Sequence, residues 1–183
     1  MSVTLSQVVE RLGKLGIRCS ELPVDRLSSP LAALACFPMY MVANVHGWTS
    51  DRQFRVPLLD LPGSEHIREA FEIGQQEGAF EMTREHRRVL GNLLTHAKPP
   101  DLVIYEYALE TLKGLLPLLS PALADTVRSG IARTVIAVAQ ASGEGVLGSG
   151  EKVSPEEREC IAQIERELSL SASPRAADAL KAI

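Results

Sequence analysis

The residues with the clearest capacity for chemistry are the acidic side chains of a glycine-rich stretch, residues 142–157. Glu144 and Glu151 lie inside this stretch, and Glu156 and Glu157 stand where the next helical pattern begins. Hard divalent cations prefer oxygen ligands, and glycines allow backbone carbonyls to turn toward an ion. The stretch therefore makes a divalent-cation site, for calcium, magnesium or zinc, feasible. The site would be weak, because the loop lacks the aspartate-rich frame of an EF-hand.

The same stretch also has a purely structural interpretation. Ser154 and Glu157 have the spacing of a capping box, in which each side chain accepts a backbone N–H of the other residue. Acidic residues are also favoured at the positive end of a helix dipole. A carboxylate that caps a helix is less available to a metal. The sequence therefore leaves two roles open for Glu157, helix cap and cation ligand.

Glycines in this stretch also match two phosphate-binding patterns in part. Gly143, Gly145 and Gly148 fit the spacing GxGxxG, but that motif requires a preceding strand in a parallel sheet. The residues before it have helical periodicity instead. A phosphate loop needs Lys followed by Ser or Thr, whereas Gly150 is followed by Glu151, which would repel a phosphate. No nucleotide cofactor is expected.

Other patterns that carry catalysis or zinc binding are missing from the sequence. The four histidines lack the spacing of zinc ligands, and no nucleophile elbow of the G-x-S-x-G type occurs. The three cysteines form no CxxC pair, and Cys36 and Cys160 fall on apolar stripes. We therefore expect a protein that is not an enzyme; the alternative is an enzyme whose catalytic residues are far apart in sequence and come together only in the fold.

Composition sets the broad class of protein. The chain has 183 residues, of which 45% are hydrophobic and 23% charged, as in soluble globular proteins. Its net charge of −4 gives no general attraction to nucleic acid or to an anionic membrane. The odd number of cysteines and the lack of a secretion signal predict a cytoplasmic location. The most apolar run, residues 30–45, is shorter than the roughly 20 residues that span a bilayer, so no membrane insertion is expected.

Apolar residues recur at helical spacing along most of the chain, and no stretch has the alternation of a strand. The first predicted helix buries Leu5, Val8, Leu12 and Leu15. Later helices are predicted to start at Ser-Pro pairs, where serine caps the helix and proline occupies its first position; these pairs begin at Ser29, Ser120, Ser154 and Ser173. The sequence thus predicts a single all-α domain over residues 1–183, with about eight or nine helices.

Two segments of the chain echo one another. Residues 42–47 and residues 138–143 both read V-A-x-x-x-G, and each is followed by a loop and a serine-capped segment. The echo predicts two pseudo-repeated helix-loop-helix halves, at about residues 28–61 and 121–170.

The second of these halves resembles the TerB-like tellurite-resistance family. The resemblance rests on Val138-Ala-Gln-Ala-Ser-Gly143 and on Gly150-Glu-Lys-Val-Ser-Pro-Glu-Glu157. It is clear over residues 131–168 and faint over residues 31–61. Such proteins are small, cytoplasmic and all-helical, and each of their two halves has an apolar helix ending in A-D-G, a loop, and S-x-E-E. The resemblance implies divalent-cation binding by the acidic positions, a role in stress or tellurite and metal resistance, protein partners, and no established catalysis.

This chain departs from the family pattern at several acidic positions. The loop aspartate is replaced by Ser142 in the second half and by His46 in the first, where Gln53 also replaces a glutamate. The resemblance therefore implies that the first half has lost its cation site.

The cation site that remains under this resemblance uses residues of the second half. It would consist of Glu144, Glu151 and Glu157, with Asp51 contributing if the two loops lie together. Other proteins, including further copies of this chain, are the expected partners. The alternative is a helical protein–protein interaction module whose 142–157 stretch is purely structural and binds no metal.

Overall fold

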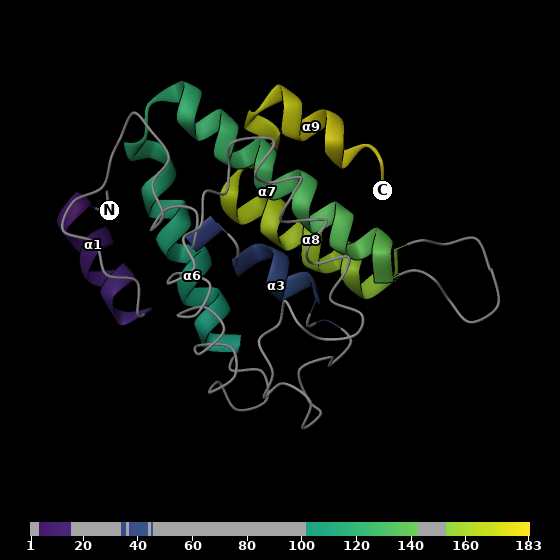
Figure 1. Ribbon diagram of the computed structural model, residues 1–183, viewed down its shortest axis with the longest axis horizontal. Coiled ribbons are helices and arrows are strands. Elements are labelled where there is room, and N and C mark those ends of the chain that lie inside the picture. The colour runs from purple at the N-terminus through teal and green to yellow at the C-terminus, as the bar shows by residue number, and fades with distance from the viewer. Residues whose placement is uncertain (1–3, 16–33, 36, 44, 46–101, 143–152) are drawn as a thin grey trace.

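The computed structural model describes residues 4–15, 34–35, 37–43, 45, 102–142 and 153–183 (Figure 1). Helices are the only regular elements in these ranges, which confirms the all-α prediction for this part of the chain. The α-helices are α1 (Leu5–Lys14), α3 (Phe37–Ala43), α6 (Leu102–Leu115), α7 (Pro121–Ser142), α8 (Pro155–Leu168) and α9 (Pro174–Leu180). Two short 3₁₀ helices follow α6 and α8, η2 (Leu116–Leu118) and η3 (Leu170–Ala172). The total number of helices and the division into two halves stay predictions.

Helix α7 is the centre of the described structure. Its residues Val127, Ile131 and Val135 have no exposed surface, and between residues 123 and 140 only Arg133 is exposed. A helix that is buried on nearly all sides must be covered by several others. Helices α3, α8 and α9 all pack against α7.

Serine caps begin the three helices of the C-terminal part, as predicted. The backbone N–H of Leu123 donates to Ser120 Oγ over 3.4 Å at the start of α7. The N–H of Ala176 donates to Ser173 Oγ over 3.3 Å at the start of α9. Each hydroxyl accepts one of the N–H groups that have no partner within the first turn of a helix.

Helix α6 joins the remaining helices to this centre. Its residues Tyr105, Leu109 and Leu112 are all buried, and the Tyr105 ring packs edge-on against Phe37 of α3 with centroids 6.4 Å apart. Helix α1 packs on the outer side of α6 (Figure 1). The apolar stripe of α1 was predicted correctly except for Leu5, which is 42% exposed. Leu5 is the first residue of α1, and the end of a helix packs less completely than its middle.

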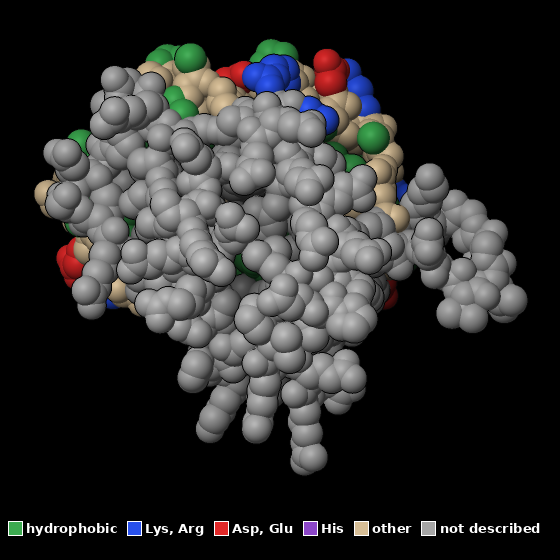
Figure 2. Space-filling view, in the orientation of Figure 1, with side chains coloured by type: hydrophobic (Ala, Val, Ile, Leu, Met, Phe, Trp, Pro, Cys, Tyr) green, Lys and Arg blue, Asp and Glu red, His purple; other side chains and the backbone are tan. Residues whose placement is uncertain are grey.

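Helices α7 and α8 form a hairpin. In Figure 1, α8 runs alongside α7 in the opposite direction, and α3 packs against both helices. Figure 2 shows described acidic and basic side chains interleaved along the upper edge of the molecule rather than gathered by sign. Across the described ranges, no helix has both the length and the apolarity needed to cross a bilayer.

Candidate functional site

The start of α8 is the one part of the predicted site that the structure places. Ser154 has extended backbone angles, φ −68° and ψ 160°, and Pro155 occupies the first turn of the helix. The N–H of Glu157 donates to Ser154 Oγ over 3.1 Å. The N–H of Ser154 donates to Glu157 Oε2 over 2.8 Å. Both halves of the predicted capping box are therefore formed, so Glu157 acts as a helix cap.

The carboxylate of Glu157 is buried, with only 2% of the residue exposed. Val153 on one side of it in sequence and Cys160 one helical turn later are buried as well. A buried carboxylate must be satisfied by donors, because an unpaired charge in a water-poor environment is strongly unfavourable. The bond from the Ser154 N–H supplies one such donor at short distance.

Cys160 shares this buried environment. Burial raises the pKa of its thiol to about 12, and the nearby charge of Glu157 adds to the rise. The thiolate is the form that binds metals and attacks electrophiles, and at neutral pH it is nearly unpopulated here. Cys160 is therefore a buried, protonated thiol, in agreement with its predicted place on an apolar stripe.

The other acidic residues of the predicted site lie outside the residues that the structure describes. These are Glu144, Glu151 and Asp51, so their positions relative to Glu157 stay predictions. Glu156 is described and exposed at the first turn of α8. Within the described ranges, no three His, Cys, Asp or Glu side chains converge as metal ligands would.

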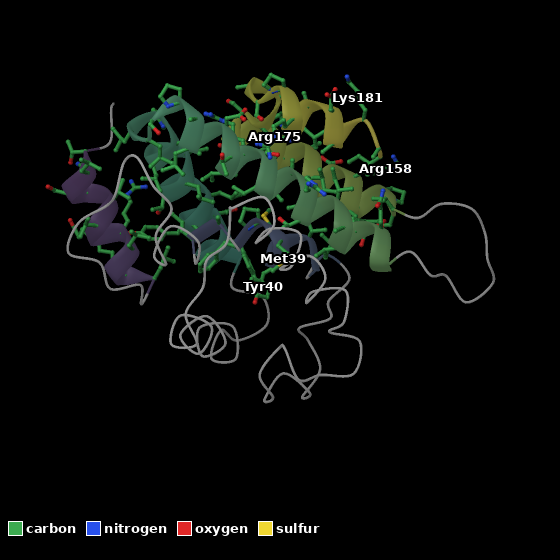
Figure 3. The ribbon with its side chains drawn as sticks, turned by 45° about the horizontal axis from the view of Figure 1, so that its top comes forward. Met39, Tyr40, Arg158, Arg175 and Lys181 are labelled. Atoms are coloured by element: carbon green, nitrogen blue, oxygen red, sulfur yellow. The ribbon has the colours of Figure 1, made fainter. Side chains whose placement is uncertain are left out.

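Polar contacts between distant parts of the chain surround the α7–α8 hairpin, and the sequence did not predict them. The guanidinium of Arg158 donates to the carbonyl oxygen of Ile183, and Gln140 Nε2 donates to the carbonyl oxygen of Ala182 over 3.5 Å. In Figure 3, Arg158 and Lys181 lie on the α8–α9 side of the molecule, whereas Met39 and Tyr40 of α3 lie on the other side. These contacts join residues 25 and 42 positions apart, so no local sequence pattern could have shown them.

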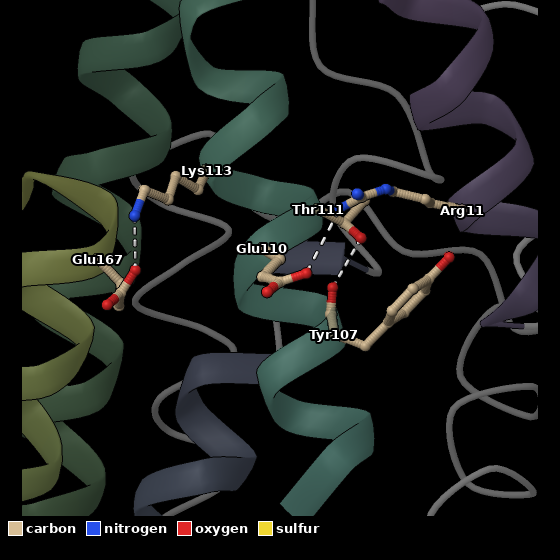
Figure 4. Close-up of polar contacts among 6 residues, drawn as sticks. All are labelled: Arg11, Tyr107, Glu110, Thr111, Lys113 and Glu167. Carbon is tan, nitrogen blue, oxygen red and sulfur yellow. Dashed lines mark hydrogen bonds and ion pairs between the residues drawn. The ribbon is translucent and has the colours of Figure 1, made fainter. Parts of the chain in front are cut away.

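A second polar group joins α1 to α6, and a salt bridge joins α6 to α8 (Figure 4). The Arg11 guanidinium carbon lies 5.7 Å from the centroid of the Tyr107 ring, and a guanidinium nitrogen lies 3.8 Å from Glu110 Oε2. Lys113 Nζ lies 2.8 Å from Glu167 Oε2, and this hydrogen bond raises the pKa of Lys113. All four charged side chains are partly or largely exposed, so these contacts orient helices with little gain in stability.

Comparison with known proteins adds no assignment. No protein-family model, no curated protein and no solved structure matches this chain.

Proposed function

We propose that this chain is a non-enzymatic, TerB-like helical protein that binds a divalent cation through its 142–157 stretch. The observation that supports the proposal is the capping box at the start of α8, with its buried Glu157 carboxylate. It occupies the position at which the resemblance puts S-x-E-E, after an apolar helix and a loop. Under this proposal the protein works in the cytoplasm, in stress or tellurite and metal resistance, together with protein partners.

The acidic residues have different roles in this proposal. Glu144 and Glu151 are the main ligands, and Asp51 adds a third if its loop lies alongside. Glu157 fixes the point where the loop joins α8, through its bond with the Ser154 N–H. A carboxylate has two oxygens and about four acceptor positions, so Glu157 could cap the helix and contact the cation together.

A metal titration of the full chain tests the proposal. Calcium, magnesium or zinc is added to chelator-treated protein, and the melting temperature is measured. A ligand that binds only the folded state raises this temperature, and about 100 Kd of free ion corresponds to roughly 2.7 kcal/mol. No rise with any of the three ions would reject the cation site.

Substitutions separate ligand from cap. Glu144→Gln with Glu151→Gln should abolish the metal-dependent rise and leave the metal-free melting temperature nearly unchanged. Glu157→Gln keeps a residue that suits the third position of a capping box but removes its charge, so a metal-dependent loss would identify it as a ligand. Glu159→Gln, at an exposed position of α8, is the matched control and should change neither value by much.

The burial of Glu157 favours a second candidate function. A carboxylate that is 2% exposed and already bonded to the Ser154 N–H is suited to a structural loop, as expected for a helical interaction module without metal. This candidate predicts that the same protein partner is captured with and without chelator, and that replacing residues 144–151 by a Gly-Ser linker removes it. Retention of the partner after this replacement would count against the loop as the contact surface.

A further inference from the structure

The segment from residue 169 to residue 183, containing η3 and α9, lies on one row of residues along α7. At one end of this row, Arg128 Nε donates to the carbonyl oxygen of Leu168 over 3.3 Å. At the other end, Gln140 Nε2 donates to the carbonyl oxygen of Ala182 over 3.5 Å. Positions four apart share one helix face, so Ala132 and Ile136 lie between these two anchors. The segment therefore runs alongside α7 in the same direction, as Figure 1 shows.

This segment is attached to the rest of the molecule mainly through α7. Helix α9 packs most extensively on α7 and on η3, and η3 packs on α7 and α8. Its buried residues are Leu170, Ser173 and Ala176, while Ala179, Leu180 and Ile183 are partly buried against the core. A seven-residue helix has little stability in isolation, so α9 requires the surface of α7 as its support.

The joint between α8 and this segment has an unfavourable backbone conformation. Ser169 has φ 49° and ψ 52°, the left-handed conformation that glycine adopts far more readily than other residues. Among the described residues it is the only one other than glycine with a positive φ. The residues that follow are already helical, so a right-handed Ser169 would let α8 continue toward η3 and carry α9 away from its own α7.

We propose that the 169–183 segment exchanges between two copies of this chain, each α9 covering the α7 of the other. Departure of the segment uncovers Leu170, Ala176, Ala132 and Ile136, which are all buried in the closed molecule. The identical segment of a second copy has the matching apolar surface and the same polar anchors, so a second copy covers what the opening exposes. Exchange also releases the left-handed conformation of Ser169 in both copies, as expected for a strained joint that leads to domain swapping.

The test is the oligomeric state of full-length variants, measured by size-exclusion chromatography with light scattering over a range of concentrations. Ser169→Val penalises the left-handed conformation and should raise the dimerisation constant by about tenfold or more relative to the unsubstituted chain. Ser169→Gly accepts that conformation without penalty and should lower the dimer fraction. Ala172→Val, at an exposed position of η3, is the control for a branched side chain in the same joint and should leave the dimer fraction unchanged.

A thiol cross-link distinguishes exchange from any other dimer. Gln140→Cys with Ala182→Cys puts one thiol on each side of one anchor, within reach of a short bis-maleimide, and each single substitution is the control. In an exchanged dimer, the reagent links the two copies, and a denaturing gel shows a covalent dimer that needs both cysteines. If the dimer fraction shows only intramolecular linkage, exchange is rejected.

Circular dichroism checks folding, and Ser169→Ala, with a smaller penalty for the left-handed conformation, replaces Ser169→Val if the latter is unfolded. Equal dimer fractions for the folded position-169 variants, or monomers at every concentration for all of them, overturn the proposal.

Discussion

Two capping boxes in the described part of the chain have the same chemistry but different surroundings. Thr4 and Gln7 form a complete box at the start of α1, and Ser154 and Glu157 form one at the start of α8. In the first box, Gln7 Oε1 accepts from the Thr4 N–H over 2.9 Å, close to the 2.8 Å of the bond from Ser154 to Glu157. Thr4 and Gln7 are exposed, whereas Glu157 is 2% exposed. Water can replace a lost partner in the first box much more readily than in the second.

The comparison shows that a sequence motif fixes the geometry of the hydrogen bonds but not their contribution to the free energy of unfolding. Both boxes satisfy the same orphan N–H groups of a first helical turn. When a side chain of the box is truncated, a backbone N–H loses its acceptor. The surrounding helices decide whether water can bond to this N–H or whether it stays unsatisfied in the interior. Substitutions in each box or in its surroundings therefore measure how burial changes the loss of stability, as well as the loss of the hydrogen bonds.

The largest expected effect concerns Cys160, one turn beyond the buried box. A pKa near 12 in place of the usual value near 9 lowers the thiolate fraction at pH 8 by about a thousandfold. Alkylation of Cys160 in the folded protein, followed residue by residue with mass spectrometry, should be at least about a hundredfold slower than in urea. Comparable rates in the two states would show that water reaches Cys160 beside the Ser154–Glu157 box.

The same thiol gives a pH dependence of stability with a definite sign. Above about pH 9 the unfolded state loses the thiol proton while the folded state keeps it until about pH 12. The contribution of Cys160 to the free energy of unfolding therefore falls as pH rises through this window. Cys160→Ala serves as the control, because it removes this part of the decline and no other.

Glu157→Ala should have the next largest effect, about 2 kcal/mol lost from the free energy of unfolding in the absence of metal. The substitution removes the acceptor of the partly buried Ser154 N–H and leaves a space where the buried Glu157 side chain was. Denaturant unfolding of the chelator-treated protein measures the loss. Gln7→Ala is the matched control in the exposed box and should cost only a few tenths of a kcal/mol. Equal losses at the two positions would contradict the role given to burial.

The smallest expected difference is between the two N-cap residues. Ser154→Ala should cost about 1 kcal/mol and Thr4→Ala about 0.5 kcal/mol, since each removes one acceptor at a helix start. The same denaturant curves measure both losses, and Thr4→Ser and Ser154→Thr are conservative controls that should recover most of the stability. A larger loss at Thr4 than at Ser154 would reverse the order that the comparison predicts.

Local patterns predicted the helices of the described part well. The serine and proline at the starts of α7, α8 and α9 act within four residues of sequence, and their effect does not depend on the rest of the fold. The spacing of four residues between Val127, Ile131 and Val135 likewise agrees with their shared buried face on α7. Leu5 shows the limit of such patterns, because periodicity does not say where a covering helix ends.

The candidate site was predictable only in its capped end. The spacing of Ser154 and Glu157 was sufficient to predict the box, because both bonds are local. Whether Glu144, Glu151 and Asp51 approach one another depends on the path of two loops, and no short-range rule sets such a path. The metal site therefore stays a prediction until a titration tests it.

By itself the sequence determined the helical class, the starts of three helices and the pairing of Ser154 with Glu157, since all of these depend on interactions between near neighbours. The tertiary structure decided that Glu157 is buried, that the Cys160 thiol is held protonated, and that residues 169–183 lie along α7. The physical reason is that solvent exclusion depends on helices brought together from distant parts of the chain. Cap geometry needs only four consecutive residues.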